Sequence, residues 1–415
     1  MNDSEFMYDF INSIIEKCGP RMPCSPQEAQ SAELIKSELE KYCDETSIEK
    51  FSCQPRAFLG YIRIIIFLNL ISFCLFFIIP LSNIIYWKYI LTFSALFINV
   101  IAFLVIWNEF FNYREFIDPL FKRKESQNVI GKIMPPEETK KILIFSGHHD
   151  SALQFNLLKK FKMGYIIFIF MGLIVMFIWL ASSFIILILV LVDLFVYEII
   201  LIYVIILFIL GIPAFSSLFF FVSSGEKANK VPGAVDNLSA VAILLGIGKF
   251  LKENKNIIPK NTEIRLISFG CEEAGLRGAY RYVERHHEEL KRLDAECVNM
   301  DGIQTPYNIA VIDFEPSTRT QHSDVVVQKL IDASQKANVT IQTSNLGGSG
   351  IFGQITGGTD ATAFSKSKIK AANISAMDLK KSLSYYHQPT DTLDKIEKGA
   401  LEEVLKICLS YIKIE

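Results

Sequence analysis

Two blocks of apolar residues interrupt a chain whose other segments mix polar and apolar positions at helical and strand spacing. The first block holds two runs, Ile64 to Leu81 and Tyr89 to Trp107, which a polar turn around Ser82 and Asn83 separates. Each run is long enough to cross a bilayer as a helix. The first block therefore predicts a transmembrane hairpin.

The second block, Gly164 to Val222, is apolar apart from Asp193 and Glu198, and its length fits two long helices or three short ones. If the segments before and after this block contribute to one site, the number of crossings is even. We expect two tilted spans that turn between Asp193 and Glu198. The alternative is two spans that end near residues 211–213, with an interfacial stretch after them. About four transmembrane helices are predicted in all.

The remaining segments predict a soluble α/β domain. Ser25 and Pro26 are typical of a helix start. Residues 128–134 and 141–146 are expected to pair as strands across a turn. From Asp236 onward helices and strands alternate, which favours a three-layer α/β/α sandwich with a mostly parallel mixed sheet whose strand ends carry the site. The expected helices cover residues 26–42, 237–252, 276–293, 322–337 and 392–414, and the other expected strands cover 46–53, 264–269, 296–301 and 369–377.

Composition agrees with a chain that lies partly in lipid. Of its 415 residues, 51% are hydrophobic and only 21% are charged, which is too apolar for an ordinary soluble protein. The formal net charge of -2, from 42 basic and 44 acidic residues, argues against nucleic-acid binding. The eight cysteines form no C-x-x-C pair and indicate free thiols in a reducing compartment, and the acidic start predicts no cleavable signal peptide.

Candidate metal ligands occur in order at strand ends. The strand over residues 141–146 leads into His148, and Asp150 follows two residues later, where it can orient the imidazole. Asp236 follows a stiff loop and begins an apolar helix. Taken alone, Asp236 is better explained as a helix N-cap.

Three further positions complete the series. Adjacent carboxylates, Glu272 and Glu273, follow an apolar strand, which indicates metal or proton chemistry. Asp301 follows the next strand, and His387 stands before the last helix. Two imidazoles and three carboxylates together suit zinc, with one carboxylate able to bridge two ions. The candidate ligands are His148, Asp236, Glu273, Asp301 and His387.

Five ordered motifs carry a family resemblance. They are Gly-His-His-Asp-Ser from 147, Pro-Gly-Ala-Val-Asp-Asn from 232, Cys-Glu-Glu-Ala-Gly from 271, Asn-Met-Asp-Gly from 299 and Tyr-His-Gln-Pro-Thr-Asp-Thr from 386. This series resembles metallopeptidase family 28, the two-zinc aminopeptidases of the aminopeptidase Y and bacterial leucyl aminopeptidase type. Glutamate carboxypeptidase, glutaminyl cyclase and the transferrin receptor are in the same family. The resemblance covers residues 3–57, 112–158 and 223–415.

The resemblance implies a zinc-exopeptidase fold, two Zn²⁺ ions and a role for each motif residue. Asp236 would bridge the ions, His148 and Asp301 would complete one, and Glu273 and His387 would complete the other. The bond between Asp236 and Asn237 would be a cis peptide.

The resemblance also implies the catalytic groups. Glu272 would act as general base, and Asp150 would hold His148 in the correct tautomer. Tyr386 would donate to the oxyanion, although a packed aromatic ring explains it equally well. Residues 357–360 resemble a loop near the substrate, where Ala361 stands in place of the histidine common in the family.

The chain departs from the family pattern through its apolar insertions. His148 and Asp236 are 88 positions apart, where the family has a short loop. We therefore expect a peptidase domain in three parts, with a hairpin inserted at each break. The parts are 1–57, 112–158 and 226–415, and the hairpins are 58–111 and 159–225.

Charge predicts which membrane face carries the peptidase domain. Basic residues cluster beside the spans on the domain side, whereas the hairpin turns carry only Lys88. The cluster comprises Arg56, Arg63, Arg114, Lys122, Arg123, Lys124, Lys159, Lys160, Lys162, Lys227 and Lys230. The positive-inside rule then predicts a cytoplasmic domain, although many members of the family act outside the cell.

The sequence thus predicts a membrane-anchored, zinc-dependent aminopeptidase that removes N-terminal residues from peptides. A carboxypeptidase or glutaminyl cyclase of the same family is the enzymatic alternative. An inactive membrane scaffold or receptor is the alternative from another class, and its expected mark would be the loss of a ligand. Spans with so few polar residues argue against a transporter.

Overall fold

A computed structural model describes residues 3–78, 86–223, 225–346 and 357–415. The predicted turn around Ser82 and Asn83 lies outside them. The chain forms two compact units, each assembled from separate stretches. The first unit comprises Met1–Pro55, Lys122–Gln154 and Gly225–Glu415, and the second comprises Arg56–Phe121 and Phe155–Ser224.

The first unit is built on a nine-stranded mixed sheet. Its strands lie in the order β1-β2-β4-β3-β5-β9-β6-β7, with β8 beside β6. The four central strands, β4, β3, β5 and β9, are parallel, whereas β1, β2, β6 and β7 join through antiparallel pairs. The strands are β1 (Glu45–Cys53), β2 (Lys124–Ile133), β3 (Lys141–His148), β4 (Thr262–Phe269), β5 (Glu296–Ile303), β6 (Ala310–Glu315), β7 (Thr320–Gln321), β8 (Gln342–Asn345) and β9 (Lys370–Ala376).

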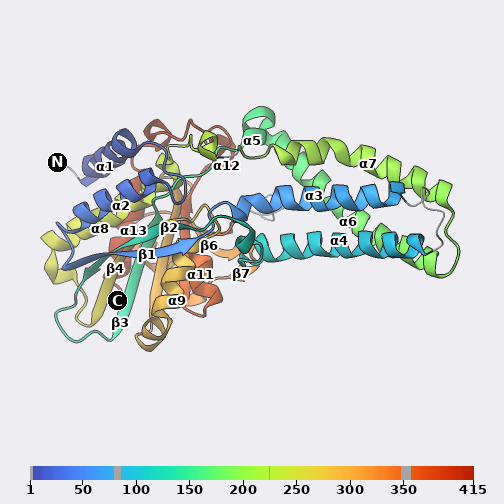
Figure 1. The fold of residues 1–415 in the computed structure, drawn as a ribbon. Coiled ribbons are helices and arrows are strands. Elements are labelled where there is room, and N and C mark those ends of the chain that lie inside the picture. Colours follow the sequence, from blue (N-terminus) through green and yellow to red (C-terminus); the bar gives the residue numbers. More distant parts are fainter. Residues whose placement is uncertain (1–2, 79–85, 224, 347–356) are drawn as a thin grey trace. The chain divides into compact units, whose positions relative to one another are not determined.

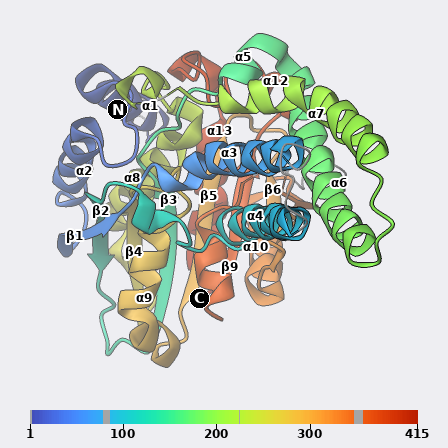
Figure 2. The ribbon, with the colours of Figure 1, turned by 45° about the vertical axis from the view of Figure 1, so that its right-hand side comes forward.

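Helices cover both faces of this sheet (Figures 1 and 2). One apolar core lies between the sheet and α1 (Asp3–Cys18), α2 (Pro26–Leu39), α8 (Ser239–Glu253), α10 (Asp324–Ala337) and α13 (Ala400–Ile412). A second core lies on the other face, under α9 (Arg277–Arg292) and α11 (Ala361–Lys366). The predicted three-layer α/β/α sandwich is therefore confirmed.

The apolar side chains of the central strands point alternately to the two faces of the sheet and so create the two cores. In β3, Leu143 and Phe145 join the first core, whereas Ile142 and Ile144 join the second. Because successive side chains of a strand point to opposite faces, a run of apolar residues needs cover on both sides. The apolar strands of the sequence therefore require a layer of helices on each face.

Several local predictions are confirmed. The side chain of Ser25 accepts the N–H of Glu28 and caps α2, and Pro26 begins that helix. The strands expected at 46–53, 264–269, 296–301 and 369–377 correspond to β1, β4, β5 and β9. The last helix begins at Ala400 rather than near 392, because Gly399, with φ of +91°, breaks the chain direction before it.

The expected pairing of residues 128–134 with 141–146 is wrong. The two segments do form strands, β2 and β3, but β4 lies between them and pairs with both. Every residue of β4 is buried. A central position, with a hydrogen-bonded strand on each side, suits such a strand better than an exposed edge of the sheet.

The second unit contains four long apolar helices and the short α5 (Asn156–Phe161). The long helices are α3 (Ala57–Ile78), α4 (Trp87–Glu109), α6 (Tyr165–Leu191) and α7 (Tyr197–Phe219). Helices α6 and α7 separate around Asp193, and α7 continues through Pro213, so the second apolar block forms two long helices. Inside this unit Phe73 stacks on Trp179 at 4.1 Å between ring centroids, and the indole N–H donates to Ser72.

Among the residues that the structure describes, five helices are long and apolar enough to cross a membrane by length and composition. Four are α3, α4, α6 and α7 of the second unit, and the fifth spans Ala234–Glu253, which includes α8. That fifth segment is 89% buried inside the first unit, where α8 covers the central strands. Its apolar character is therefore explained by the sandwich core.

A buried ion cluster at Glu296 predicts how stability depends on pH. Tyr411 donates to Glu296 at 2.7 Å, and Lys329 and Lys141 approach it at 2.9 and 3.0 Å. Burial opposes ionisation, but these contacts outweigh it and lower the pKa of Glu296 to about 2. A lowered pKa stabilises the fold above the unfolded value of about 4.5, and this contribution is lost as pH falls toward 2.

We expect Glu296→Gln to lower the thermal midpoint of detergent-purified protein at pH 7. The difference from wild type should shrink as pH falls below about 4.5. The control is Glu38→Gln, which removes a half-buried partner of the exposed Lys41 and should change little. A difference that stays constant between pH 7 and pH 3.5 would contradict the assignment.

Candidate metal centre

The candidate ligands gather where the central strands end. His148 is the last residue of β3, Glu272 and Glu273 follow β4, and Asp301 lies near the end of β5. Because β3, β4 and β5 are parallel neighbours, their carboxyl ends meet at one edge of the sheet. His387 reaches this edge from the segment between α12 (Leu379–Ser382) and α13.

Asp236 lies in a distorted turn, Ala234–Leu238, that precedes α8. Gly233 begins this turn with φ of +64°, and a side chain there would meet the carbonyl oxygen of Asp236 at 2.6 Å. The bond between Asp236 and Asn237 is cis, as the resemblance implied. The side chain of Asn237 donates to the carbonyl of Met300 at 2.9 Å and so ties the turn to β5.

The carboxylate of Asp236 lies between the two histidines. Its Oδ1 is 3.2 Å from Nε2 of His148, and its Oδ2 is 3.4 Å from Nε2 of His387. Oε1 of Glu273 is also 3.4 Å from Nε2 of His387. Lone pairs at these separations repel one another unless a proton or a cation lies between them.

Two groups of potential ligand atoms result, and each group lies within 4.8 Å. The first comprises His148, Asp236 and Asp301, and the second comprises Asp236, Glu273 and His387. Asp236 belongs to both. All five candidate ligands are thus brought together, and Asp236 stands where one carboxylate can contact two ions.

Electrostatics at this edge favours cations. Burial, followed by the charge of neighbouring acids, raises the pKa of Glu272 and Glu273 well above the usual range and that of Asp301 to about 7. For Asp236 the two histidines outweigh burial and lower the pKa. Buried carboxylates at this density stay ionised together only when positive charge offsets them. A donor set of imidazole and carboxylate therefore fits divalent ions such as zinc.

Asp150 contacts both the segment that carries His148 and the segment that carries Glu272 and Glu273. Its carboxylate accepts the backbone N–H of Glu272 at 3.1 Å and that of Glu273 at 3.0 Å. Nδ1 of His148 lies 3.1 Å from the carbonyl oxygen of Asp150 and 3.5 Å from its carboxylate. Asp150 is thus placed to orient the imidazole and also to fix the backbone that carries the two glutamates.

Asp391 was not singled out from the sequence, although it lies in the Tyr-His-Gln-Pro-Thr-Asp-Thr motif. Its buried carboxylate accepts the backbone N–H groups of Val235 at 2.8 Å and Asp236 at 3.2 Å. Burial, reinforced by the charge of Asp236, raises the pKa of Asp391 to about 8. Its position four residues after His387 was the available signal.

Arg21 is a second supporting residue that sequence reasoning did not assign. The fully buried guanidinium donates to the carbonyl of His149 at 2.8 Å and to that of Gly233 at 3.3 Å. The Arg21 backbone N–H donates to Ser151 Oγ at 2.8 Å. The N-terminal segment therefore braces both loops that carry His148 and Asp236.

Residues 357–360 are held by Glu315. Its buried carboxylate accepts from the backbone and hydroxyl of Thr359 and contacts Nε2 of His322 at 3.1 Å. The adjacent Asp360 is fully buried, and burial raises its pKa well above the usual value. Tyr386, the predicted oxyanion donor, is half-buried, and its ring lies 4.0 Å from the ring of His387.

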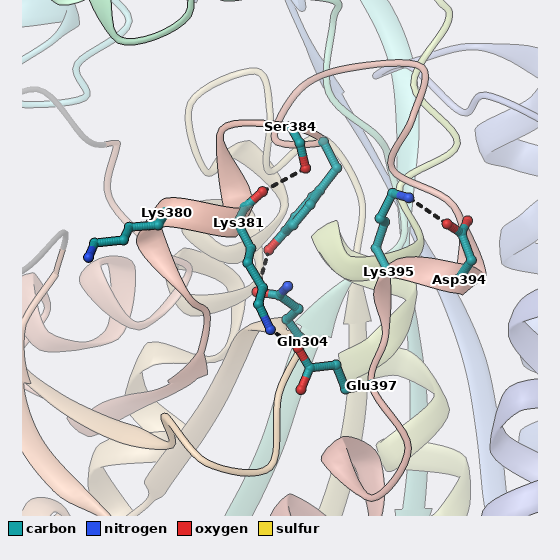
Figure 3. Close-up of a pocket in the computed structure, with 8 residues that line it drawn as sticks. Gln304, Lys380, Lys381, Ser384, Asp394, Lys395 and Glu397 are labelled. Carbon is teal, nitrogen blue, oxygen red and sulfur yellow. Dashed lines mark hydrogen bonds and ion pairs between the residues drawn. The ribbon is translucent and has the colours of Figure 1, made fainter.

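A small cavity of about 260 Å³ lies beside the segment that precedes His387 (Figure 3). Tyr385 lines it and donates to Gln304 at 2.9 Å, while Lys381 pairs with Glu397 and Lys395 pairs with Asp394. Its lining includes none of the candidate metal ligands.

Comparison of this chain with known protein families and proteins supports the family resemblance over part of the chain. Residues 221–412 match Peptidase family M28. Aminopeptidase YwaD of Bacillus subtilis is 30% identical over 175 residues, which are 41% of this chain and 35% of that protein. The aligned region thus spans about a third of this relative's length.

Solved structures share the fold. A zinc aminopeptidase from Bacillus subtilis aligns with a TM-score of 0.54 at 15% identity, covering 99% of this chain and 94% of that one. A glutaminyl cyclase from Fimbriiglobus ruber aligns with a TM-score of 0.55 at 11% identity, covering 99% and 95%. At these identities the likeness shows a common architecture, and a choice of reaction needs other evidence.

Shared use of Asp236 predicts unequal effects of ligand substitutions. His148→Ala and His387→Ala each remove a ligand from one group, and each should lower the zinc retained after dialysis by about one ion per chain. Asp236→Ala should lower retention at both positions. His286→Ala is the control, because its half-buried imidazole pairs with Glu49 and belongs to neither ligand group. Elemental analysis that finds full zinc content in Asp236→Ala would contradict the arrangement.

Proposed function

We propose that this chain is a membrane-anchored aminopeptidase that uses two zinc ions to remove N-terminal residues from peptides. The observation that carries the proposal is the position of Asp236 between two ligand groups. His148 and Asp301 would hold one ion with Asp236, and Glu273 and His387 would hold the other. When bound, such ions supply Lewis acidity toward the scissile carbonyl and toward water.

Glu272 is the proposed general base. It belongs to neither ligand group, and its carboxylate lies in the same buried edge, with Oε2 3.7 Å from Nε2 of His148. From this position Glu272 would accept a proton from the attacking water and return it to the departing amine. The hydrogen bonds from the Glu272 and Glu273 backbone to Asp150 would keep the carboxylate aimed at the reacting atoms.

The ligand set favours peptide hydrolysis over the alternatives. A scaffold or receptor of this family is expected to have lost ligands, whereas both groups are complete here. Completeness of both groups also favours a two-metal peptidase over a glutaminyl cyclase. The similarity to aminopeptidase YwaD supports a free N-terminus as the substrate feature.

We propose that α3, α4, α6 and α7 are the membrane anchor. Isoleucines cover exposed positions of α6 and α7, including Ile188 and Ile199, which are 56% and 66% exposed. Exposed apolar side chains at this density suit lipid rather than water. The basic residues beside the spans support a cytoplasmic position for the first unit.

Removal of the proposed base gives the direct test of catalysis. We expect Glu272→Gln to lower kcat/KM on a free-amine aminoacyl chromogenic substrate by about 10²- to 10⁴-fold while zinc content stays unchanged. Glu284→Gln is the control, because this exposed glutamate of α9 lies outside the centre. N-acetylated substrates should not be cleaved by either protein.

Two outcomes would overturn this proposal. Full activity in Glu272→Gln would remove Glu272 from the mechanism. A zinc-loaded wild-type protein that cleaves no free-amine substrate, but cyclises N-terminal glutamine or cleaves C-terminally free peptides, would establish one of the family alternatives.

Membrane topology is tested by labelling single introduced cysteines with a membrane-impermeant thiol reagent in intact cells. We expect Asp193→Cys, between α6 and α7, to be labelled from outside. Lys160→Cys and Lys227→Cys, on either side of the second apolar block, should be labelled only after permeabilisation. Labels on opposite faces at Lys160 and Lys227 would exclude an even number of crossings.

A further inference from the structure

Three cysteine side chains converge from distant parts of the first unit. Cys24 precedes α2, Cys53 ends β1, and Cys271 follows β4 immediately before Glu272. Their sulfur atoms lie 3.3 Å apart for Cys24 and Cys271, and 3.6 Å apart for each of the other two pairs. The sequence spacing shows no sign of this cluster, because its members are 29 and 218 positions apart along the chain.

The triangle of sulfur atoms suits a metal ion better than a disulfide. A disulfide brings two sulfurs to about 2.05 Å and leaves the third apart. Around zinc, with Zn–S bonds of about 2.3 Å in a tetrahedron, neighbouring sulfurs are about 3.8 Å apart. The three observed separations, 3.3 to 3.6 Å, are nearly equal and close to this sulfur–sulfur distance, so no pair is favoured for a disulfide.

The surrounding backbone is fixed by a buried carboxylate. Glu28 accepts the N–H of Cys24 at 2.8 Å and that of Cys271 at 3.0 Å. Both cysteines have left-handed backbone, with φ of +56° and +55°. Residues other than glycine keep such angles only where their surroundings impose them. The two thiols are therefore preorganised toward Cys53 by contacts outside the cluster.

The three cysteines belong to one small apolar cluster. Cys53 and Cys271 are fully buried beside Phe51 and Ala274, whereas Cys24 is only partly buried. A divalent cation would offset two of the three charges of buried thiolates. A fourth ligand would come from solvent at the partly exposed Cys24.

We propose that Cys24, Cys53 and Cys271 form a third metal site, separate from the candidate catalytic centre, that takes a soft divalent ion such as zinc. Binding forms three metal–sulfur bonds and releases the three thiol protons to solvent, with no change of oxidation state. The ion would join the N-terminal segment and β1 to the loop that presents Glu272 and Glu273. This site stands independently of the proposed peptidase activity.

Cobalt substitution of the full chain in detergent tests the site. Cobalt bound by thiolates gives a sulfur-to-metal charge-transfer absorption in the near ultraviolet, which imidazole and carboxylate ligands do not give. We expect this band in the wild type and in the His148→Ala/Asp236→Ala double variant. Cys24→Ser should abolish the band and lower zinc content by one ion per chain. Loss of peptidase activity alone would not affect these readouts.

Cys18→Ser is the matched control, because this cysteine lies in the same unit and outside the cluster. It should keep the band and the full zinc content. A second readout uses the wild type alone, so it does not depend on whether the variants fold. In the wild type, zinc should protect the partly exposed Cys24 from alkylation, and a chelator should make it reactive, as mass spectrometry of the modified peptide would show.

Two results would overturn the proposal. A wild-type protein without the charge-transfer band, or with the same zinc content in Cys24→Ser, has no thiolate-held ion. A disulfide between any two of the three cysteines in protein purified with zinc and without reductant, seen as loss of two alkylatable thiols, would establish a redox pair in place of a metal site.

Discussion

The structure of the candidate centre depends on the cost of burying negative charge. Asp236, Glu272, Glu273 and Asp301 share one edge of the sheet, where the imidazoles of His148 and His387 approach three of these carboxylates. Asp150 and Asp391 each accept two backbone N–H groups, which offset the cost of burying these two further carboxylates. The negative charge that remains is the physical reason for proposing divalent ions at this edge.

The positions of the two apolar insertions explain how a discontinuous chain still forms one sandwich. One apolar insertion lies between β1 and β2 and the other between β3 and α8, so both leave the first unit from connections and spare the strands. Long insertions into connections cost little conformational entropy beyond the first few residues. Arg21, buried against the carbonyls of His149 and Gly233, binds together loops that the second insertion separates in sequence.

Local signals in the sequence predicted much of this arrangement, and contacts between distant segments account for what it missed. The cap at Ser25, the apolar central strands and the acids after β4 are local patterns, and each was predictable. The insertion of β4 between β2 and β3, the short strands β6 to β8, and the support from Asp391 and Glu315 depend on partners far along the chain. Helix α8 shows the same limit, because its apolar composition matches a membrane span and only its cover over β3, β4 and β5 identifies it as core.

The loop after β4 joins the candidate catalytic centre to the proposed thiolate site. Cys271 belongs to the thiol cluster, and the next two residues are the proposed base and a proposed ligand. Glu28 holds the N–H of Cys271, while Asp150 holds those of Glu272 and Glu273, so three consecutive backbone groups are fixed by buried carboxylates. Positions of the two carboxylates are thereby set by contacts on both sides, a degree of preorganisation that general-base chemistry requires.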